Sequence, residues 1–397
     1  MKIVVVSDWF AEKMGYSENV LPKYLAKYGN EVHLVTSDFQ PAFPDYEQTY
    51  QPFLGPRQQA IGTKEMQGYL LHRLPHGRQG PGVAICGLFG KLKEIRPDIV
   101  QCFTIPSLST YQCSIYKYLL GYKLFLEEHV HASVFRFPKR WQDRLRLAFY
   151  RASVGKWLSF SSERCYPIAP DVARIACDYF GFSKGKIKIV SLGVDTDYFC
   201  PASDKTMLES RMNIRDRYNF KPNDIVCVYS GRFTPDKNPL CLAHAIQLLN
   251  KESPVFRGLF IGAGPQEETI RGCNGCVIER FVDYRILGHY YRAADIGVWP
   301  RQESTSQIDA AACGLPLILS NRVEVRERVE GNGFVYDENN PEDLARKIRI
   351  LSDFELRQSM GKYASEKMKQ LFSWDLIAKE RLADYATAME YGRAHRF

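Results

Sequence analysis

Short runs of β-branched and other apolar residues alternate with helix-like stretches along most of this chain, and no other feature constrains the fold as much. The first five runs are "KIVVV", "EVHLVT", "GYLLHRL", "PDIVQCF" and "YKLFLE". Between the first two, apolar side chains recur at helical spacing from Ser17 to Tyr28. Strands that alternate with helices of this length form a parallel sheet with helices on both faces. We therefore predict an α/β fold with a Rossmann-like sheet.

The same alternation starts again after "KIKIVSLGVDTDYFCP", with "DIVCVYSG", "FRGLFIG", "CVIERFV", "ADIGVWP" and "LPLILS". A chain of 397 residues is long enough for two cores of about 200 residues each. We predict an N-terminal Rossmann-like domain over 1–195 and a second one over 196–373, with the linker at 193–201. The helix expected over 374–397 is too apolar on one side to be a free tail.

Two such sheets that face one another form a cleft, and α/β proteins bind ligands at the carboxyl ends of their strands. In "VYSGRFTPDKNPLCLAHAIQLL" a strand ends at Gly231 and is followed by Arg232 and Lys237. Glycine lets the backbone approach a ligand closely, and two cations at one strand exit suit a diphosphate. The strand of "FIGAGPQEETI" runs into Gly264 and Pro265, which is a weak signal when taken alone.

Taken in order, these motifs are specific. The chain resembles the GT-B glycosyltransferases, in particular the retaining family 4, over nearly its whole length. The resemblance rests on "MGYSENVLPKYLAKYGNEVHLVT", "PDIVQ", "GVDTDYF", "GRFTPDKNP", "GAGP", "YYRAADIGVWP" and "DAAACGLPLI". It implies two Rossmann-like domains that face across a cleft, with the last helix crossing back to the first domain.

The resemblance also implies an activity. A hexose passes, with retention, from a UDP- or GDP-sugar to a glycan or lipid-linked saccharide in surface polysaccharide or glycolipid synthesis. Arg232 and Lys237 match the residues that hold the donor's diphosphate. With a helix N-terminus, these cations supply the positive charge that a metal would otherwise provide. We expect no metal and no cofactor, because the nucleotide sugar is the substrate.

Two further positions carry roles implied by the family. In "AEKMGYSEN", Gly15 matches the second glycine of a loop that approaches the phosphates and sugar from the opposite domain, while Met14 stands where the first usually is. In "FLEEHVHAS", His129 matches a histidine near the donor sugar, with His131 as the alternative. Either histidine could instead simply cap this loop.

The segment "WPRQESTSQIDAAACGLPLIL" departs from the family pattern of two glutamates separated by seven residues. Asp309 stands in the place of the second, whose role is to bind the ribose, but Arg301 stands in the place of the first and accepts no hydrogen bonds. Either the loop is two residues shorter and Glu303 contacts the hexose, or the first acid is lost and the function is altered. We favour Glu303, because small polar residues follow it that can cap a helix and present backbone N–H groups to phosphate. These residues are Ser304, Thr305 and Ser306.

A basic segment at 135–157 holds seven Arg or Lys residues against one acid, Asp143. Apolar residues recur along it at helical spacing: Trp141, Leu145, Ala148, Phe149 and Ala152. Two hypotheses stay open. Such a helix suits an anionic membrane surface or a polyprenyl diphosphate-linked acceptor, or its aromatic face packs on the first sheet. No nucleic-acid recognition motif accompanies the charge.

Eleven cysteines without framework spacing indicate reduced thiols and a cytoplasmic protein. The one CxxC, Cys273 to Cys276, is better explained as a turn than as a zinc site. The sequence has no apolar stretch near the ~20 residues that cross a bilayer. We expect a soluble protein, or one peripheral on the cytoplasmic membrane face.

Two other functions compete with glycosyl transfer. A GT-B sugar-nucleotide epimerase has the same fold, and fold does not fix function. A catalytically idle nucleotide-binding partner of other glycosyltransferases would explain Arg301 and Met14.

Overall fold

The computed structural model describes residues 1–41, 43, 45–80 and 82–394, which form two compact units. The first unit contains Met1–Glu12, Tyr16–Leu192 and Trp374–Phe397, and the second contains Lys13–Gly15 and Gly193–Ser373. The chain passes between them at 192/193, three residues before the predicted boundary, and again at 373/374. Each unit is built around its own parallel sheet, so the predicted α/β class is confirmed.

The sheet of the first unit has seven strands and is parallel except for its edge strand β3. Its order is β3 (Gly62–Glu65), β4 (Leu70–Leu74), β2 (Glu31–Ser37), β1 (Lys2–Ser7), β7 (Ile99–Phe103), β8 (Lys123–Glu128) and β9 (Arg164–Pro167). The central strands are buried on both faces, which explains why they read as continuous apolar runs. All five strands expected in this half are present.

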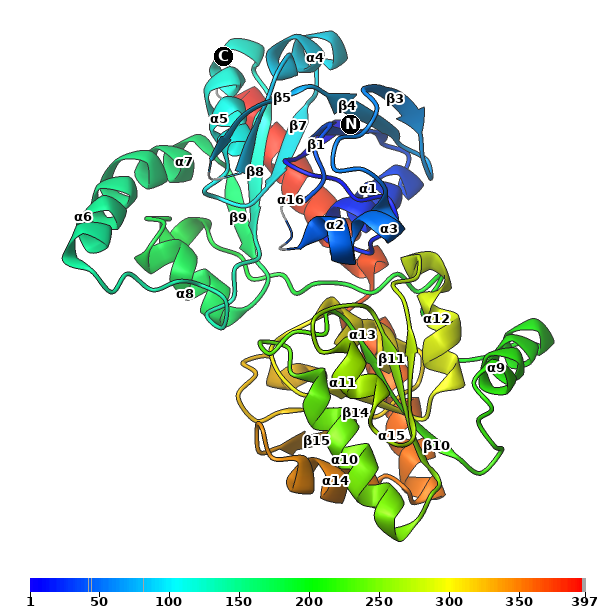
Figure 1. The fold of residues 1–397 in the computed structure, drawn as a ribbon. Helices are drawn as coiled ribbons and strands as arrows, with labels where there is room; N and C mark the ends of the chain where they lie inside the picture. The colour runs from blue at the N-terminus through cyan, green and yellow to red at the C-terminus, as the bar shows by residue number, and fades with distance from the viewer. Residues whose placement is uncertain (42, 44, 81, 395–397) are drawn as a thin grey trace. The chain divides into compact units, whose positions relative to one another are not determined.

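Helices cover this sheet, and a separate hairpin of β5 (His76–Gly80) and β6 (Gly82–Ile85) lies beside it (Figure 1). The helices before residue 190 are α1 (Ser17–Lys27), α2 (Tyr46–Thr49), α3 (Gln51–Leu54), α4 (Leu88–Ile95), α5 (Leu108–Leu120), α6 (Trp141–Tyr150), α7 (Lys156–Ser161), α8 (Pro170–Asp178) and the 3₁₀ turn η2 (Lys184–Lys186). The helix expected near 17–28 is α1.

The last helix, α16 (Trp374–Ala394), packs within the first unit (Figure 1). Arg381 pairs with Glu127 at the end of β8, with 2.8 Å between Nη2 and Oε2, and each side chain is 1% exposed. Tyr385 donates a hydrogen bond of 2.9 Å to Gln101 of β7. A fully desolvated ion pair therefore joins the last helix to the middle of the sheet.

The second unit has a six-stranded sheet in which every strand is parallel to its neighbours. Its order is β12 (Cys276–Glu279), β11 (Phe256–Ile261), β10 (Ile225–Ser230), β13 (Ile296–Trp299), β14 (Leu317–Ser320) and β15 (Gly333–Tyr336). Its helices are α9 (Lys205–Arg217), α10 (Pro239–Glu252), α11 (Glu267–Arg271), α12 (Tyr284–Ala293), α13 (Thr305–Ala312), the 3₁₀ turn η3 (Arg326–Arg328), α14 (Pro341–Ile350) and α15 (Phe354–Leu371). The sequence predicted five of these strands and missed β15.

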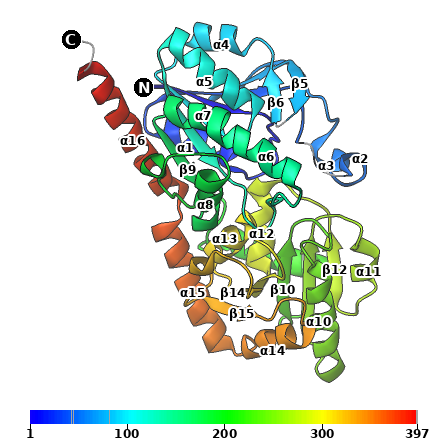
Figure 2. The ribbon, with the colours of Figure 1, turned by 90° about the vertical axis from the view of Figure 1, so that its left-hand side faces the viewer.

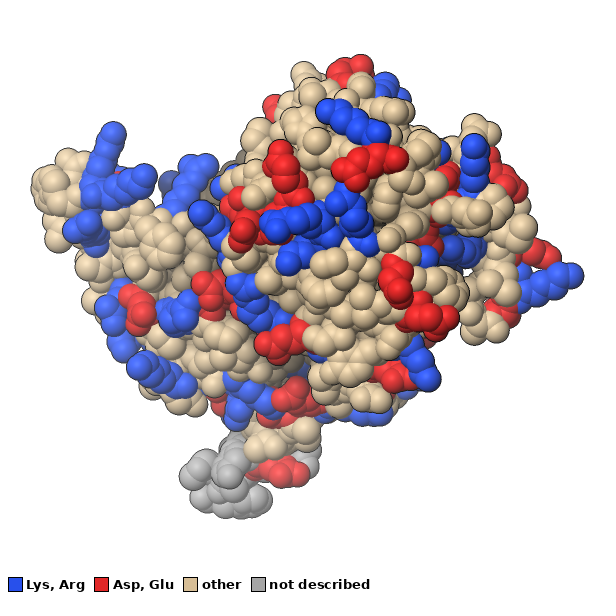
Figure 3. Space-filling view, turned by 90° about the horizontal axis from the view of Figure 1, so that it is seen from below, with Lys and Arg blue, Asp and Glu red and all other residues tan. Residues whose placement is uncertain are grey.

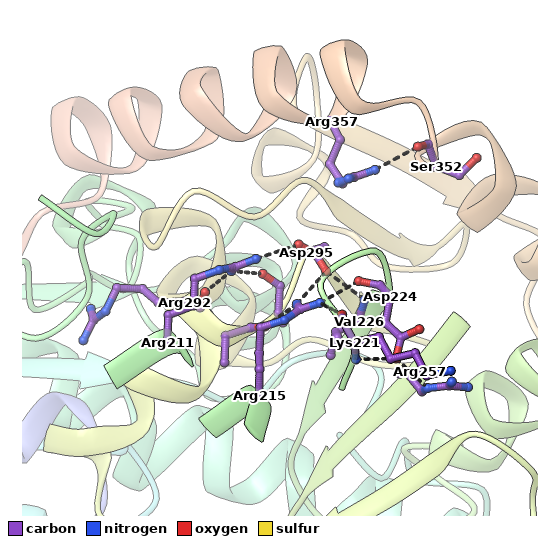
Figure 4. Close-up of polar contacts among 12 residues, drawn as sticks. Arg211, Arg215, Lys221, Asp224, Val226, Arg257, Arg292, Asp295, Ser352 and Arg357 are labelled. Carbon is purple, nitrogen blue, oxygen red and sulfur yellow. Dashed lines mark hydrogen bonds and ion pairs between the residues drawn. The ribbon is translucent and has the colours of Figure 1, made fainter. Parts of the chain in front are cut away.

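A network of arginines and aspartates lies at the amino-terminal edge of this sheet (Figure 4). Asp295, directly before β13, pairs with Arg211 and Arg215 of α9 at 3.0 and 3.2 Å. Asp224, directly before β10, pairs with Arg257 at 2.9 Å. Because these groups precede their strands, they lie opposite the carboxyl ends. The network fixes α9 and leaves the carboxyl edge for a ligand.

Helices α6 and α7 are joined through one π-helical turn, η1 (Arg151–Gly155), into a continuous helix that faces the viewer in Figure 2. Helix α6 has no buried residue. The exposed fractions of Trp141, Leu145 and Phe149 are 68%, 58% and 74%. The hypothesis that this aromatic face packs on the first sheet is therefore wrong for α6.

None of the helices in the described ranges is long and apolar enough to cross a bilayer. All eleven cysteines are free thiols, as the sequence indicated.

Candidate functional site

Three glycines bring the loops after β10 and β11 into contact. A Cβ added to Gly262 would lie 1.9 Å from the carbonyl oxygen of Gly231, and one added to Gly264 would lie 2.6 Å from that of Phe233. All three glycines have positive φ, between 147° and 154°. Gly262 and Gly264 are thus needed because one loop backbone touches the other. The sequence attributed Gly231 to ligand approach, but a Cβ there would lie 2.8 Å from the Tyr229 hydroxyl. Pro265, next in the chain, is exposed.

Arg232 and Lys237 lie on the β10 loop, and both are half-buried. Arg232 Nη2 pairs with Asp236 at 3.1 Å, and Lys237 Nζ donates a hydrogen bond of 3.1 Å to the backbone carbonyl of Glu303. Burial, together with the smaller effect of the positive charge of Arg232, lowers the pKa of Lys237 to about 8. The structure therefore places a poorly solvated cation beside the loop after β13, where an anion would relieve it.

The side chains of Glu303 and Arg301 have different partners. Glu303 Oε1 accepts a hydrogen bond from the backbone N–H of Glu324 at 3.1 Å, and its carbonyl binds Lys237. Arg301 pairs with Glu338 at 3.4 Å and donates a hydrogen bond of 3.4 Å to the carbonyl of Pro235, in the same loop as Lys237. Gln302 between them has φ +60°, so the chain reverses here. Of the two positions, only Glu303 is joined to the predicted phosphate-binding cations.

The serines and threonine after Glu303 begin α13 but do not cap it with their side chains. Ser304 is the N-cap residue and forms no side-chain cap hydrogen bond, contrary to the predicted cap. Its carbonyl instead accepts from Arg328 at 3.0 Å, and the same guanidinium donates to Gln307 at 3.0 Å. Ser306 contacts the Tyr291 hydroxyl. Thr305 is the first helical residue. The sequence gave no sign of Arg328, because its position depends on a loop that folds back over α13.

Asp309 lies on the inner side of α13 and is only 9% exposed. Burial raises the pKa of its carboxyl well above the ordinary range, and the charge of Asp195 adds to the rise while Arg328 opposes it. A ribose-binding role for Asp309 stays a prediction. The raised pKa means that this carboxyl is protonated more easily than in water, and the protonated form can donate as well as accept.

Gly15 lies against an aromatic ring in the second unit. Its Cβ, if it had one, would be 3.1 Å from Cδ2 of Tyr284, and the backbone N–H of Tyr284 donates to the carbonyl of Lys13 at 3.0 Å. The close approach expected at Gly15 therefore exists, but it is to Tyr284.

In the first unit, His129 follows β8 and stands over a buried acid. Its Nε2 is 2.8 Å from Oε1 of Glu127, whose other oxygen binds Arg381. Burial opposes protonation of His129, but the hydrogen bond and charge of Glu127, with smaller effects of Glu18 and Glu128, raise its pKa overall. His129 is thus fixed in orientation and partly exposed.

His131, the alternative, is buried and has a structural partner. Its Nδ1 lies 3.1 Å from Oδ2 of Asp171 in the first turn of α8, and the same carboxylate accepts from the N–H of Ala132 at 2.8 Å. This arrangement is the loop-capping role that the sequence left open for both histidines.

The sequence reasoning missed an acid at the carboxyl end of β1. Asp8 is 5% exposed and accepts hydrogen bonds from the hydroxyls of Ser107, at 2.6 Å, and Ser109. Burial raises its pKa, and these hydrogen bonds oppose the rise. The signal was available, because an acid directly after a buried strand lies at the ligand-binding edge of a parallel sheet. In the described residues no group of three or more His, Cys, Asp or Glu side chains could hold a metal ion.

Two parallel sheets in separate units, with paired cations after a strand of the second, define the GT-B class. Solved structures with the same fold cover the whole chain. Sucrose-phosphate synthase from Thermosynechococcus elongatus has a TM-score of 0.67 at 18% identity, over 98% of this chain and 100% of that one. Alr3699/HepE from Anabaena, in complex with UDP and glucose, has a TM-score of 0.67 at 15% identity, over 97% and 99%. Identities this low compare the fold alone.

The family is assigned by sequence. The family models described as Glycosyltransferase Family 4 and Glycosyl transferases group 1 match residues 21–198 and 224–353. The chain belongs to this family, the GT-B glycosyltransferases of family 4, group 1.

Curated relatives match part of the chain. A D-inositol 3-phosphate glycosyltransferase from Geodermatophilus obscurus is 26% identical over 252 residues, 58% of this chain and 53% of that protein. Spore coat protein SA from Bacillus subtilis is 27% identical over 227 residues, 52% of this chain and 60% of that protein. The chain spans little more than half the length of these relatives.

Proposed function

We propose that this protein transfers a hexose, with retention of configuration and without a metal, from a UDP- or GDP-sugar to a glycan or lipid-linked saccharide. The observation that carries the proposal is the burial of the Lys237 ammonium group at the carboxyl edge of the second sheet. Its pKa of about 8 means that the folded protein holds this charge at a free-energy cost. A diphosphate between Lys237 and Arg232 would offset that cost.

The proposed chemistry follows from where charge develops. Breaking the bond between the hexose and the nucleotide builds negative charge on the β-phosphate. Cations held in a poorly solvated place stabilise this developing charge more than they stabilise the bound donor, and so they lower the barrier. In the resemblance to family 4 the leaving phosphate itself deprotonates the acceptor, so we assign no protein general base.

Glu303 is proposed to contact the donor hexose and Asp309 the ribose. The Glu303 backbone is already joined to Lys237, at 3.1 Å, so hexose and diphosphate contacts would come from one connected group. Gly15 and His129 keep the roles that the resemblance implies. The structure of Alr3699/HepE with UDP and glucose is consistent with a nucleotide donor, although it concerns that protein.

A screen of UDP- and GDP-hexoses for slow donor hydrolysis without an acceptor tests this proposal. Release of free hexose with the nucleoside diphosphate is the expected result. Conversion of labelled donor into an epimeric nucleotide sugar would replace the transferase with an epimerase. Calorimetry with UDP and GDP completes the test, because binding of a nucleotide without turnover would indicate the catalytically idle partner, and binding of neither would leave the site without support.

We further propose a peripheral contact between this protein and an anionic, cytoplasmic membrane surface through 135–157. Exposed apolar residues run along one side of the continuous helix: Trp141, Leu145, Phe149, Trp157 and Phe160. At the left-hand side of Figure 3, where α6 lies, basic side chains flank uncharged ones. Exposed aromatic residues beside Lys and Arg are typical of a helix that lies in a membrane interface.

Co-sedimentation with vesicles measures this contact. At physiological salt the protein should pellet with anionic phosphatidylglycerol vesicles more than with neutral phosphatidylcholine vesicles. Phe149→Ser should reduce the pelleted fraction, since it removes an exposed apolar side chain without disturbing a core. The proposal would be contradicted if the pelleted fraction were the same with both vesicle types and the same for the wild type and the variant.

A further inference from the structure

A groove lies beneath α6 in the first unit, with a volume of about 1080 Å³. We name it the α6 groove. Apolar and aromatic side chains line it: Tyr111, Phe135, Phe137, Leu147, Tyr150 and Phe180. The hydroxyls of Tyr111 and Tyr150 satisfy one another at 3.1 Å, and the rings of Phe135 and Phe180 meet edge to face at 5.9 Å. The groove is as large as pockets that enclose a drug-sized ligand, about 300–1,000 Å³.

Cations surround this apolar interior. The charged residues that line the α6 groove are Arg136, Lys139, Arg140 and Arg146, with one acid, Asp143. The first three are exposed on the loop before α6, and Arg146 is exposed on the helix. An apolar interior with a cationic rim complements a molecule that has a hydrocarbon chain and an anionic head.

The α6 groove lies beside the carboxyl ends of strands in the first sheet. Pro106 and Tyr111 come from the segment after β7, and Phe135 and Phe137 come from the loop after β8 that also carries His129. Parallel strands end at one edge, so the groove begins beside the edge where GT-B ligands are expected. Its other wall is α6, whose exposed residues Trp141, Leu145 and Phe149 do not line the groove.

We propose that the α6 groove binds the hydrocarbon chain of a phosphate-bearing acceptor lipid, with the phosphate held by the cationic rim. The inference rests on the proposed function and names its acceptor class. Leu147 and Tyr150 on the inner face of α6 contact the chain, and Arg146 contacts the phosphate. A lipid would reach the groove from the membrane on which the outer face of the same helix lies.

Alkyl phosphates below their micellar concentration test the groove without a membrane. Decyl phosphate, octyl phosphate and inorganic phosphate are titrated calorimetrically into the full chain. One decyl phosphate should bind per chain, about tenfold more tightly than octyl phosphate, since each buried methylene is worth about fourfold in affinity and the last two are partly exposed. Inorganic phosphate should bind at least a hundredfold more weakly. Equal affinities for the two chain lengths would overturn the proposal.

Neighbouring positions on α6 supply matched variants. Leu147→Glu places a charge in the α6 groove and should weaken decyl phosphate at least tenfold. Ala148→Glu, at the next and exposed position outside the groove, should change it less than twofold. Arg146→Glu should weaken the binding of both alkyl phosphates, and Arg151→Glu, which does not line the groove, should not. All four side chains are exposed or half-buried, so circular dichroism melting should confirm that the variants fold.

Other occupants give other results. If the α6 groove is an interface with a second copy, light scattering will detect a dimer that Leu147→Glu dissociates, and decyl phosphate will not bind. UDP calorimetry separates this inference from the proposed function. Normal UDP binding without alkyl phosphate binding would refute the lipid-acceptor proposal and leave the proposed donor site standing. Alkyl phosphate binding without UDP binding would refute the proposed donor site and leave the α6 groove proposal standing.

Discussion

Raising the pH through 8 should weaken the binding of a nucleoside diphosphate to this protein, because Lys237 loses its proton there. Burial holds the pKa of Lys237 at about 8. If only the protonated side chain binds the diphosphate fully, the dissociation constant should rise about tenfold between pH 7 and pH 9, or ~1.4 kcal/mol. Above pH 9 each further unit should add another factor of about ten.

Calorimetric titration with UDP and GDP from pH 7 to 9 measures this slope, and Lys237→Arg is the matched control. Arginine stays charged throughout, so the variant should show a flat profile even if its affinity is lower. Lys237→Ala should abolish turnover at every pH. A wild-type profile as flat as that of Lys237→Arg would refute the assignment of Lys237 to the diphosphate.

The pH dependence of stability gives an independent check that the pKa of Lys237 is lowered in the folded protein. The folded protein holds the pKa of Lys237 below its unfolded value, near 10.4. Between about 8 and 10.4 the unfolded chain therefore binds more protons, so this residue makes the free energy of unfolding rise with pH. At pH 7 the charged side chain is a cost of about 1–3 kcal/mol after allowance for its partial exposure. Lys237→Ala should thus leave the melting temperature at pH 7 unchanged or raise it, and a fall of many degrees would make Lys237 structural.

Three further sets of substitutions test other parts of the structure. Glu303→Ala should remove donor turnover, while Arg301→Ala should retain most of it, since that variant loses a half-exposed ion pair and one hydrogen bond to the Pro235 carbonyl; equal losses would contradict the shortened-loop hypothesis. Arg381→Met should lower the free energy of unfolding by about 3–5 kcal/mol by leaving Glu127 charged and buried, and adding Glu127→Gln should restore part of it; chemical denaturation measures both. Asp309, whose folded pKa is raised, should make the unfolding free energy fall as pH rises above about 3.9. Asp309→Asn should reduce that fall in a melting series from pH 4 to 8, and identical pH dependence in both proteins would count against the burial argument.

The candidate site was partly predictable because it lies at strand ends. Arg232 and Lys237 were proposed because they follow a strand, and Glu303 was proposed from the departure from the family pattern. The structure joins Lys237 to the carbonyl of Glu303, while Arg232 pairs with Asp236 in its own loop. Arg328 and Asp195 were not found, since their contacts with α13 come from distant segments that no local pattern connects to it. Asp8 was missed although its position after the first strand was visible.

The sequence also misjudged the reasons for some residues. Gly231 was explained by ligand approach, but the Tyr229 hydroxyl lies 2.8 Å from where its Cβ would be. Gly264 was only a weak signal, and there the backbone of the β10 loop occupies the space that a Cβ would fill. His129 and His131 are indistinguishable in "EEHVH", and only the partner of each, Glu127 or Asp171, separates a partly exposed histidine from a buried cap.

The sequence alone determined the two Rossmann-like sheets and the strand ends that carry the cations, because strand and helix periodicity are local properties of the chain. The resemblance to the family came from the ordered motifs. Tertiary structure decided which charged groups lose water. It desolvates Lys237, buries Asp309 beside Asp195, joins Arg381 to Glu127, and leaves the aromatic face of α6 in solvent with an apolar groove beneath it. Burial depends on residues far apart in the chain, and the pKa and the exposed surface depend on burial.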